Sequence, residues 1–212
     1  MSQKLFDSSE QDTLAEIIAH RRDIRGNNFL STPIEKEKLD KILNAASLAP
    51  SVGFSQPWEF VMVNDKATRT AIVDDHRLAN SAAKEKFTRN EQSKYSELKL
   101  EGIIESPINI AVFYCPSNAP VLGQDSMPEM GEYSVVCAIQ NMWLTARAMN
   151  IGLGWVSILN PETLKSLLNA PREHKLIGYL CIGYVKEFLA QPELEKLQWR
   201  DRKKLTIISE KY

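Results

Sequence analysis

The densest group of chemically active side chains is a run of three arginines and one aspartate, Arg21-Arg22-Asp23-Ile24-Arg25. Guanidinium groups hold phosphate through charge-assisted and often bidentate hydrogen bonds. Arg21 and Arg25 are four residues apart, so in a continuing helix they project from one face and can grip one anion. The helix macrodipole alone also favours basic residues at a helix C-terminus. The run therefore indicates either a phosphate site or a solvated helix end.

A second group lies in the segment 49–58, Ala-Pro-Ser-Val-Gly-Phe-Ser-Gln-Pro-Trp. Ser51, Gly53 and Gln56 offer a hydroxyl, an accessible backbone and a side-chain amide, which are the groups that orient a polar heterocycle. The alternative is an ordinary turn, stiffened by its two prolines, with the tryptophan as a core residue.

The third group is the sequence Gly-Leu-Gly-Trp-Val-Ser at 152–157. Gly154 allows another group to approach the backbone closely. Ser157 alternates with apolar neighbours, so it is either a ligand-binding hydroxyl or an inward serine bonded to backbone. Because no Gly-x-Ser-x-Gly elbow surrounds it, we do not expect a hydrolase nucleophile.

Several common catalytic signatures are missing from the sequence. It has no phosphate-binding GxxxxGK[ST], no GxGxxG after a strand and no HExxH. His20, His76 and His174 have no cysteine or carboxylate at metal-ligand spacing, so the sequence predicts no metal site. The three widely spaced cysteines lie in or beside apolar segments, which predicts reduced, largely buried small hydrophobic residues.

Length and composition favour one domain over residues 1–212, since 43% of the residues are hydrophobic and can build a real core. The formal net charge of -1 gives no reason to expect nucleic acid or an anionic membrane as a partner. The longest apolar runs are far shorter than the roughly 20 residues of a membrane span. The polar N-terminus has no secretory h-region, so we expect a cytoplasmic protein.

Hydrophobic periodicity places helices and strands between these groups. We expect helices at about 8–22, from 33 onward, within the charged segment 66–100, at 132–150 and at 161–168, and strands at 58–63, 108–114, 153–159 and 176–185. Because strands and helices do not alternate regularly, the pattern favours an α+β sandwich with a mixed sheet. The helix at 132–150 is apolar nearly all round and needs more covering than one chain easily provides, which suggests a homodimer.

The three groups, in this order and at these separations, resemble the nitroreductase family over about residues 14–202. The features that carry the resemblance are an arginine-rich segment after the first helix, an Ala-Pro-Ser loop ending in Gln-Pro-Trp, and a Gly-Leu-Gly-Trp strand entry. The resemblance implies a three-layer sandwich, a mixed central sheet flanked by helices, and an intertwined homodimer with FMN at the interface. It also implies that a C-terminal extension at about 186–212 packs on the partner subunit.

Within that family, the chain is similar to the branch that consumes reduced FMN instead of recycling it. Asp23 stands where ordinary nitroreductases usually have a serine, and Ser-Val-Gly-Phe at 51–54, Lys-Leu-Glu-Gly at 99–102 and Gly-Trp-Val-Ser at 154–157 fit the same branch. Two departures are visible. Ser55 stands where a larger residue such as methionine is expected, and Gly-Tyr-Val at 183–185 replaces the Gly-Tyr-Pro of ordinary nitroreductases.

This resemblance implies that reduced FMN is a substrate, which oxygen converts to 5,6-dimethylbenzimidazole and erythrose 4-phosphate, and that a separate NAD(P)H-flavin reductase supplies it. Cutting the flavin requires proton removal at carbon, and Asp23 is the candidate base, with Ser157 as a second catalytic group. The alternative for Asp23 is structural, because three neighbouring arginines favour its charged form and make it a weak base. The residues implied to bind flavin are Arg21, Arg22, Asp23, Ile24, Arg25, Ser51, Gly53, Gln56, Leu100, Gly154 and Ser157. An NAD(P)H-dependent nitro- or quinone reductase that keeps its FMN, and a non-catalytic flavin-binding protein, are the competing hypotheses.

Overall fold

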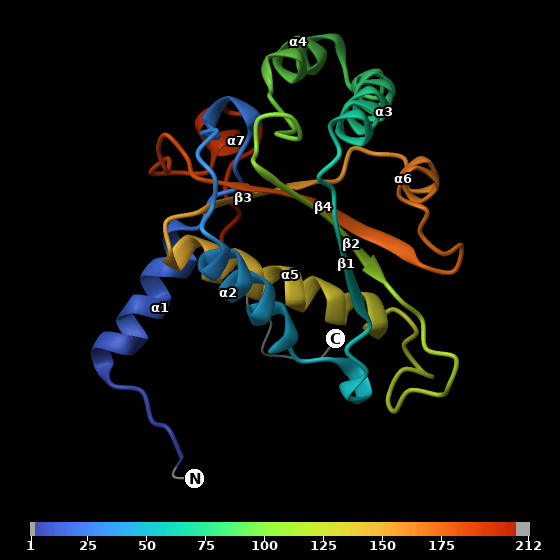
Figure 1. Ribbon diagram of the computed structural model, residues 1–212. Helices are drawn as coiled ribbons and strands as arrows, with labels where there is room; N and C mark the ends of the chain where they lie inside the picture. The colour runs from blue at the N-terminus through green and yellow to red at the C-terminus, as the bar shows by residue number, and fades with distance from the viewer. Residues whose placement is uncertain (1–2, 207–212) are drawn as a thin grey trace.

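A computed structural model describes residues 3–206 and shows a four-stranded sheet between two layers of helices (Figure 1). The strand order is β1-β2-β4-β3, and all three neighbouring pairs are antiparallel. The strands are β1 (Trp58–Met62), β2 (Ile108–Tyr114), β3 (Gly152–Val156) and β4 (Lys175–Gly183). The α+β three-layer sandwich predicted from the sequence is confirmed, but the expected mixed sheet is not. Within residues 3–206 the parallel pairing is one isolated bridge, between Asp23 and Leu153.

One face of the sheet carries α1 (Ser8–His20), α2 (Lys36–Ser47) and α5 (Met130–Ala148). The helix α5 crosses all four strands and packs against α1 and α2 as well. Its inward side is completely buried at Val135, Ile139 and Met142, among others. This layer and the sheet enclose the larger of two hydrophobic cores.

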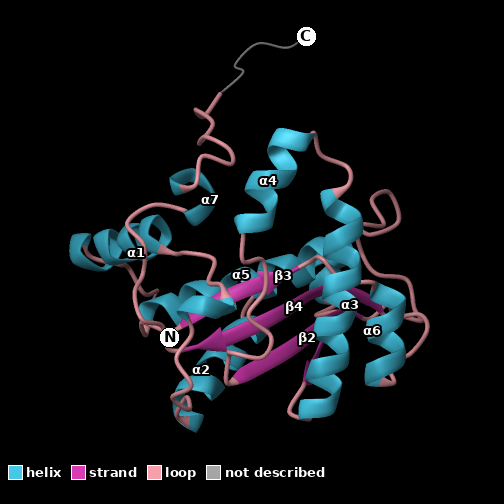
Figure 2. Cartoon of the chain, turned by 90° about the horizontal axis from the view of Figure 1, so that it is seen from above, coloured by secondary structure: helices cyan, strands magenta, loops and turns pink. Residues whose placement is uncertain are grey.

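The opposite face carries α3 (Lys66–Lys84), α4 (Arg89–Glu97) and α6 (Pro161–Leu168), as Figure 2 shows from above. Ile72 of α3 and Leu164 of α6 are fully buried here against Phe113 and Tyr179 of the sheet. The strand residues of the two cores alternate along β2 and β4, as the two-residue period of a strand requires. Both cores therefore depend on the same sheet.

The first helix ends earlier than its sequence pattern predicts. It stops at His20, and Arg21 is already extended. The cause is tertiary, because Asp23 forms a bridge with Leu153 and the Ile24 N–H donates to the Leu153 carbonyl at 3.2 Å. The expectation that a continuing helix presents Arg21 and Arg25 on one face is therefore wrong.

The second helix begins at Lys36, three residues later than the proline at 33 suggests. The preceding chain is held extended, since Phe29 bridges Val185 and the Leu30 N–H donates to the Tyr184 carbonyl. The boundaries of the other predicted helices and strands agree with the structure to within a few residues.

The C-terminal segment folds back over its own chain, with the short helix α7 at Glu193–Lys196. Trp199 packs edge-on against Phe87 and Tyr95, at centroid distances of 5.2 and 5.9 Å. Packing of the extension on a partner subunit stays a prediction, and its last part, 207–212, lies outside the described residues. Among the described residues, no helix combines the length and the apolar character that a membrane crossing requires.

Part of the α1/α2/α5 layer leaves apolar side chains uncovered. The helix α1 has no buried residue, and Leu14 and Ile18 are each 53% exposed. On α5, Tyr133 is 51% exposed and Val136 40% exposed. Because α1 and α5 contact each other, this layer exposes apolar side chains on two neighbouring helices, which is a feature of contact surfaces.

Candidate functional site

Asp23 lies beside β3, the strand at one edge of the sheet. The outer side of β3 pairs there with the backbone of the 23–24 segment. Asp23 Oδ1 accepts a hydrogen bond from the Trp155 N–H at 3.0 Å, and its Oδ2 forms an ion pair with the Arg25 guanidinium. The backbone bridge and these two contacts fix the carboxylate in position. Its side chain keeps 32% of its surface exposed. Asp23 is therefore an oriented carboxylate that a ligand can still reach.

Burial raises the pKa of Asp23 above its ordinary value. The Arg25 guanidinium, the Trp155 N–H and Arg21 act in the opposite direction but do not outweigh the desolvation. This direction is the reverse of what the neighbouring arginines alone predict. A carboxylate with a raised pKa is a stronger base than a solvated one, which favours the catalytic role over the purely structural one.

Arg21 and Arg25 line the same cleft as this carboxylate, and both favour its charged form. One Arg25 nitrogen donates to the Leu100 carbonyl at 3.3 Å, which brings the predicted residue Leu100 to the site through its backbone. The Arg21 guanidinium lies over the Trp143 ring of α5, 4.6 Å from its centroid. Stacking on an aromatic ring holds a guanidinium in place and leaves its N–H groups available for an anion.

Arg22 also lines this region but is only 8% exposed. Its guanidinium donates to four backbone carbonyls, those of Ala19, Arg21, Leu189 and Ala190. Since a guanidinium has five N–H donors, at most one remains for a ligand. These contacts tie the end of α1 to the C-terminal segment.

Ile24 and Gly154 shape the site through packing. Ile24 is buried, and a Cβ on Gly154 would fall onto the Ile24 carbonyl oxygen. Glycine is therefore required where β3 passes the 21–25 segment. Ser157 is exposed and lies one residue past the end of β3. Its hydroxyl has no hydrogen-bond partner within residues 3–206, so its role stays a prediction.

The loop at 51–57 has an unusual backbone. Gly53, Phe54 and Gln56 all have positive φ, at 54°, 55° and 48°. Left-handed conformations of non-glycine residues are uncommon and gather at functional sites, where the surrounding structure holds them. The Ser51 hydroxyl accepts from the Gln56 N–H at 3.1 Å and closes the loop. The buried Ser55 hydroxyl has no hydrogen-bond partner in the described chain, which leaves a donor for a ligand or a partner.

This loop and the arginine segment contact different parts of α5. The Val52 N–H donates to Ser134 near the start of the helix, whereas Trp143 near its end donates to the Arg22 carbonyl. Nine residues of helix separate these two anchors by about 14 Å, at 1.5 Å per residue. One chain therefore does not bring Ser51, Gly53 and Gln56 next to Asp23.

A cleft of about 130 Å³ opens beside Asp23 and is lined by Arg21, Arg22, Asp23, Arg25 and residues 192–194. Pockets for cofactor-sized ligands usually exceed about 300 Å³, so this cleft alone is too small for a flavin. A larger, open hollow of about 820 Å³ lies under the 117–128 loop, but no basic side chain lines it. The charged groups converge on the cleft at Asp23, which makes this cleft the candidate site. No sequence pattern pointed to the part that residues 192–194 play in it.

The three cysteines differ in their environments. Cys181 is fully buried, as predicted, and burial raises the pKa of its thiol to about 12. Cys115 and Cys137 are less completely buried than Cys181, but each keeps most of its surface covered, in line with the prediction. Burial and the Glu59 carboxylate raise the pKa of the Cys115 thiol to about 11, which is the opposite of an activated nucleophile.

Comparisons with known proteins place this geometry in context. Residues 18–184 match the nitroreductase family. The chain is 44% identical to a 5,6-dimethylbenzimidazole synthase of Rhodospirillum rubrum over 96% of this chain and 97% of the relative. It is 36% identical to a 5,6-dimethylbenzimidazole synthase of Rhodobacter capsulatus over 92% and 95%. Iodotyrosine deiodinase 1 of Rattus norvegicus is 30% identical over 85% of this chain and 65% of the relative.

Solved structures share the fold. Iodotyrosine deiodinase bound to FMN and 3-iodo-L-tyrosine superposes with a TM-score of 0.74 at 20% identity, covering 94% of this chain and all of that one. A nitroreductase family protein from Clostridium novyi NT gives a TM-score of 0.63 at 21% identity, covering 82% and 86%. At these identities the likeness establishes the architecture.

Proposed function

The chain belongs to the nitroreductase family, and we propose that it catalyses the reaction of its 5,6-dimethylbenzimidazole synthase relatives. In this reaction oxygen and reduced FMN give 5,6-dimethylbenzimidazole, the lower ligand of cobalamin, and erythrose 4-phosphate, while the pyrimidine carbons of the flavin leave as a separate fragment. Three such synthases, at 34 to 44% identity, each align over more than nine-tenths of this chain and of their own length. The chain is thus an oxidoreductase for which flavin is a substrate.

The observation that carries the proposal is the oriented carboxylate of Asp23. It lies in a cleft that Arg21 and Arg25 also line, and its pKa is raised by burial. Fragmenting the flavin requires a group that removes a proton from carbon, and a base of raised pKa at a fixed position suits that task. A flavin that only shuttles hydride to an acceptor has no need of such a carboxylate.

The other residues of the cleft bind and orient. Arg21 and Arg25 keep N–H donors for the FMN phosphate or the flavin oxygens. The Trp155 N–H holds the carboxylate in one orientation, and such positioning lowers a barrier by several kcal/mol. Reduced flavin supplies the electrons that reduce oxygen and the carbon skeleton that is cut.

The proposal includes a homodimer with FMN between the subunits. The cleft at Asp23 is too small for a flavin, and the 51–57 loop is anchored far from it in one chain. A second copy whose loop reaches this cleft completes the site, with Ser51, Gly53, Ser55 and Gln56 offering polar groups to the flavin ring. The uncovered apolar residues of α1 and α5 are available to form the interface.

Because the reaction consumes one reduced FMN per turnover, a separate NAD(P)H-dependent flavin reductase must supply it. The expected place for this pair is the cytoplasm, where NAD(P)H is available. The test mixes the purified protein with FMN, NADH and a flavin reductase in air, follows the flavin absorbance and separates the products by chromatography.

Stoichiometric loss of flavin with appearance of 5,6-dimethylbenzimidazole supports the proposal. Intact FMN with NADH oxidation by the protein alone overturns it and identifies a nitro- or quinone reductase. Intact FMN without NADH oxidation identifies a flavin-binding protein. Asp74→Asn is the matched control for variants of Asp23, because Asp74 also pairs with a nearby arginine but lies exposed on α3.

A further inference from the structure

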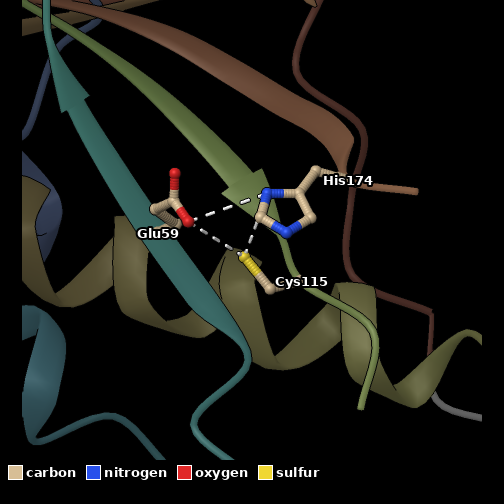
Figure 3. Close-up of side chains that lie close together, drawn as sticks. All are labelled: Glu59, Cys115 and His174. Atoms are coloured by element: carbon tan, nitrogen blue, oxygen red, sulfur yellow. Dashed lines mark hydrogen bonds and ion pairs between the residues drawn. The ribbon is translucent and has the colours of Figure 1, made fainter. Parts of the chain in front are cut away.

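A glutamate, a cysteine and a histidine meet at the end of the sheet where β1 begins, β2 ends and β4 begins (Figure 3). Glu59 comes from β1, Cys115 directly follows β2, and His174 directly precedes β4. The residues are far apart in the sequence, and no spacing pattern connects them. None of the three belongs to the cleft at Asp23.

The strand register explains why these side chains meet. Glu59 pairs with Phe113, and Tyr114 pairs with Lys175, so Cys115 and His174 are the next opposed positions beyond the strands. Side chains two residues apart on a strand share a face, which puts Cys115 on the side of Phe113 and Glu59. Glu59, Cys115 and His174 therefore project from the sheet face that α3 and α6 cover.

The three ligand atoms form a nearly equilateral triangle. Cys115 Sγ lies 3.5 Å from His174 Nδ1 and 3.7 Å from Glu59 Oε2, and His174 Nδ1 lies 3.7 Å from Glu59 Oε2. Zinc bonds sulfur at about 2.3 Å and nitrogen or oxygen at about 2.0–2.2 Å, so tetrahedral angles separate such ligand atoms by about 3.4–3.6 Å. The observed triangle agrees with that geometry to within about 0.3 Å.

Hydrogen bonds cannot join all three pairs of these ligand atoms at the same time. The thiol carries one proton and a neutral imidazole one on either nitrogen, and each proton points to a single acceptor. At least one of the three edges is then left without a hydrogen bond. A cation bound to all three atoms engages each of them at once.

We propose that Glu59, Cys115 and His174 form a binding site for a zinc-type divalent cation. Sulfur, imidazole and carboxylate donors together suit Zn²⁺, whereas Mg²⁺ and Ca²⁺ prefer oxygen ligands throughout. Three protein ligands leave a fourth position for water. The Glu59 carboxylate is 46% exposed, so a cation has a path to the site from solvent.

The position of the site indicates a structural role. His174, just before β4, lies eight residues from Ile182, which pairs with Leu153 beside Asp23; eight residues of extended chain span about 27 Å. The Cys115 N–H donates to the Pro57 carbonyl at 2.9 Å, at the base of the 51–57 loop. A bound cation thus connects the ends of β1, β2 and β4 and stabilises the end of the 51–57 loop next to β1.

The experiment titrates the full-length protein, first treated with a chelator, with Zn²⁺ against a chromophoric competitor. One equivalent per chain is expected, with a rise in the unfolding temperature on loading. Cys115→Ala, His174→Gln and Glu59→Gln should each weaken binding by about tenfold or more. Cys137→Ala is the matched control, because Cys137 is also a partly buried free cysteine but lies outside the cluster.

A second measurement does not depend on any variant. Co²⁺ bound at this site should give the near-ultraviolet charge-transfer absorption of a thiolate ligand and the visible bands of a tetrahedral ion. Absence of stoichiometric binding, absence of the thiolate band, or equal weakening by Cys137→Ala would overturn the proposal. Because neither readout involves flavin, the outcome is independent of the flavin reaction.

Discussion

Replacing Asp23 by asparagine separates the chemistry of this residue from its structural contribution. Asparagine has nearly the same shape, and its side-chain oxygen can still accept the Trp155 N–H. The variant loses the negative charge, the ion pair with Arg25 and the ability to take up a proton. The fold should therefore persist while the flavin reaction fails.

The expected change in stability is small. An ion pair with part of its surface in solvent contributes about 0–1 kcal/mol. The raised pKa of Asp23 already includes the effect of Arg25, so folding disfavours the ionised form on balance, and the variant removes this net cost. The free energy of unfolding at pH 7 should change by about 1 kcal/mol or less, a shift of about 4 °C or less in Tm.

The pH dependence gives the sign of the effect. A carboxyl whose folded pKa lies above its unfolded value contributes stability below the unfolded pKa, near 3.9 for aspartate, and that contribution is lost as pH rises through the folded pKa. The wild type should therefore lose stability relative to Asp23→Asn as pH rises from the acid range to neutrality. Thermal unfolding of both proteins from pH 4 to 7 measures this difference.

The expected change in activity is large, because general acid–base catalysis contributes about 10²–10⁴-fold in rate, equal to about 3–5 kcal/mol of barrier. Flavin loss in the coupled assay should fall by this factor in Asp23→Asn and stay near the wild-type rate in Asp74→Asn. Retention of wild-type turnover by Asp23→Asn would refute the assignment of Asp23 as base. A Tm loss well beyond 4 °C would refute the argument from its pKa.

Three further outcomes follow from the structure. Gly154→Ala should lower Tm by several degrees and weaken flavin binding, measured by flavin fluorescence, since its Cβ meets the Ile24 carbonyl and displaces the segment that carries the cleft. Burial lowers the pKa of His76, so the neutral imidazole stabilises the fold above about pH 6.5, and this stability is lost as the pH falls. In His76→Gln, the Tm should therefore fall less with decreasing pH below about 6.5 than in the wild type. Val136→Glu on the uncovered side of α5 should shift sedimentation towards the monomer, whereas Leu78→Glu, at an exposed position on α3, should leave it unchanged.

The elements of secondary structure were largely predictable from the sequence because their signals are local. The strand at 108–114 and the helix starting at Pro161 have their patterns and caps within a few residues of themselves. The three groups of site residues were also visible as short runs, and their order along the chain was enough to indicate the family. A raised pKa for Asp23 was not predictable, because it results from burial in a fold that places β3, more than a hundred positions away, beside this residue.

Local patterns failed where a distant strand took part. The sequence pattern predicted that the first helix runs through Arg22. In the structure, residues 23–24 pair with the outer side of β3, and the helix ends at His20. Arg22 looked equivalent to its neighbours, yet its guanidinium is bound by carbonyls of the C-terminal segment. In both places a long-range hydrogen-bond partner outweighs a local preference worth only fractions of a kcal/mol per residue.

The sequence by itself determined the family, the order of helices and strands, and the residue types available to the flavin reaction, because these are encoded in neighbouring positions. Only the tertiary structure decided that the 51–57 loop stands apart from Asp23 within one chain. It alone brought Glu59, Cys115 and His174 into one triangle. The physical reason is that register is set by how two strands pair. Which side chains meet at the end of a sheet therefore depends on pairing between distant segments, and no spacing along the chain encodes it.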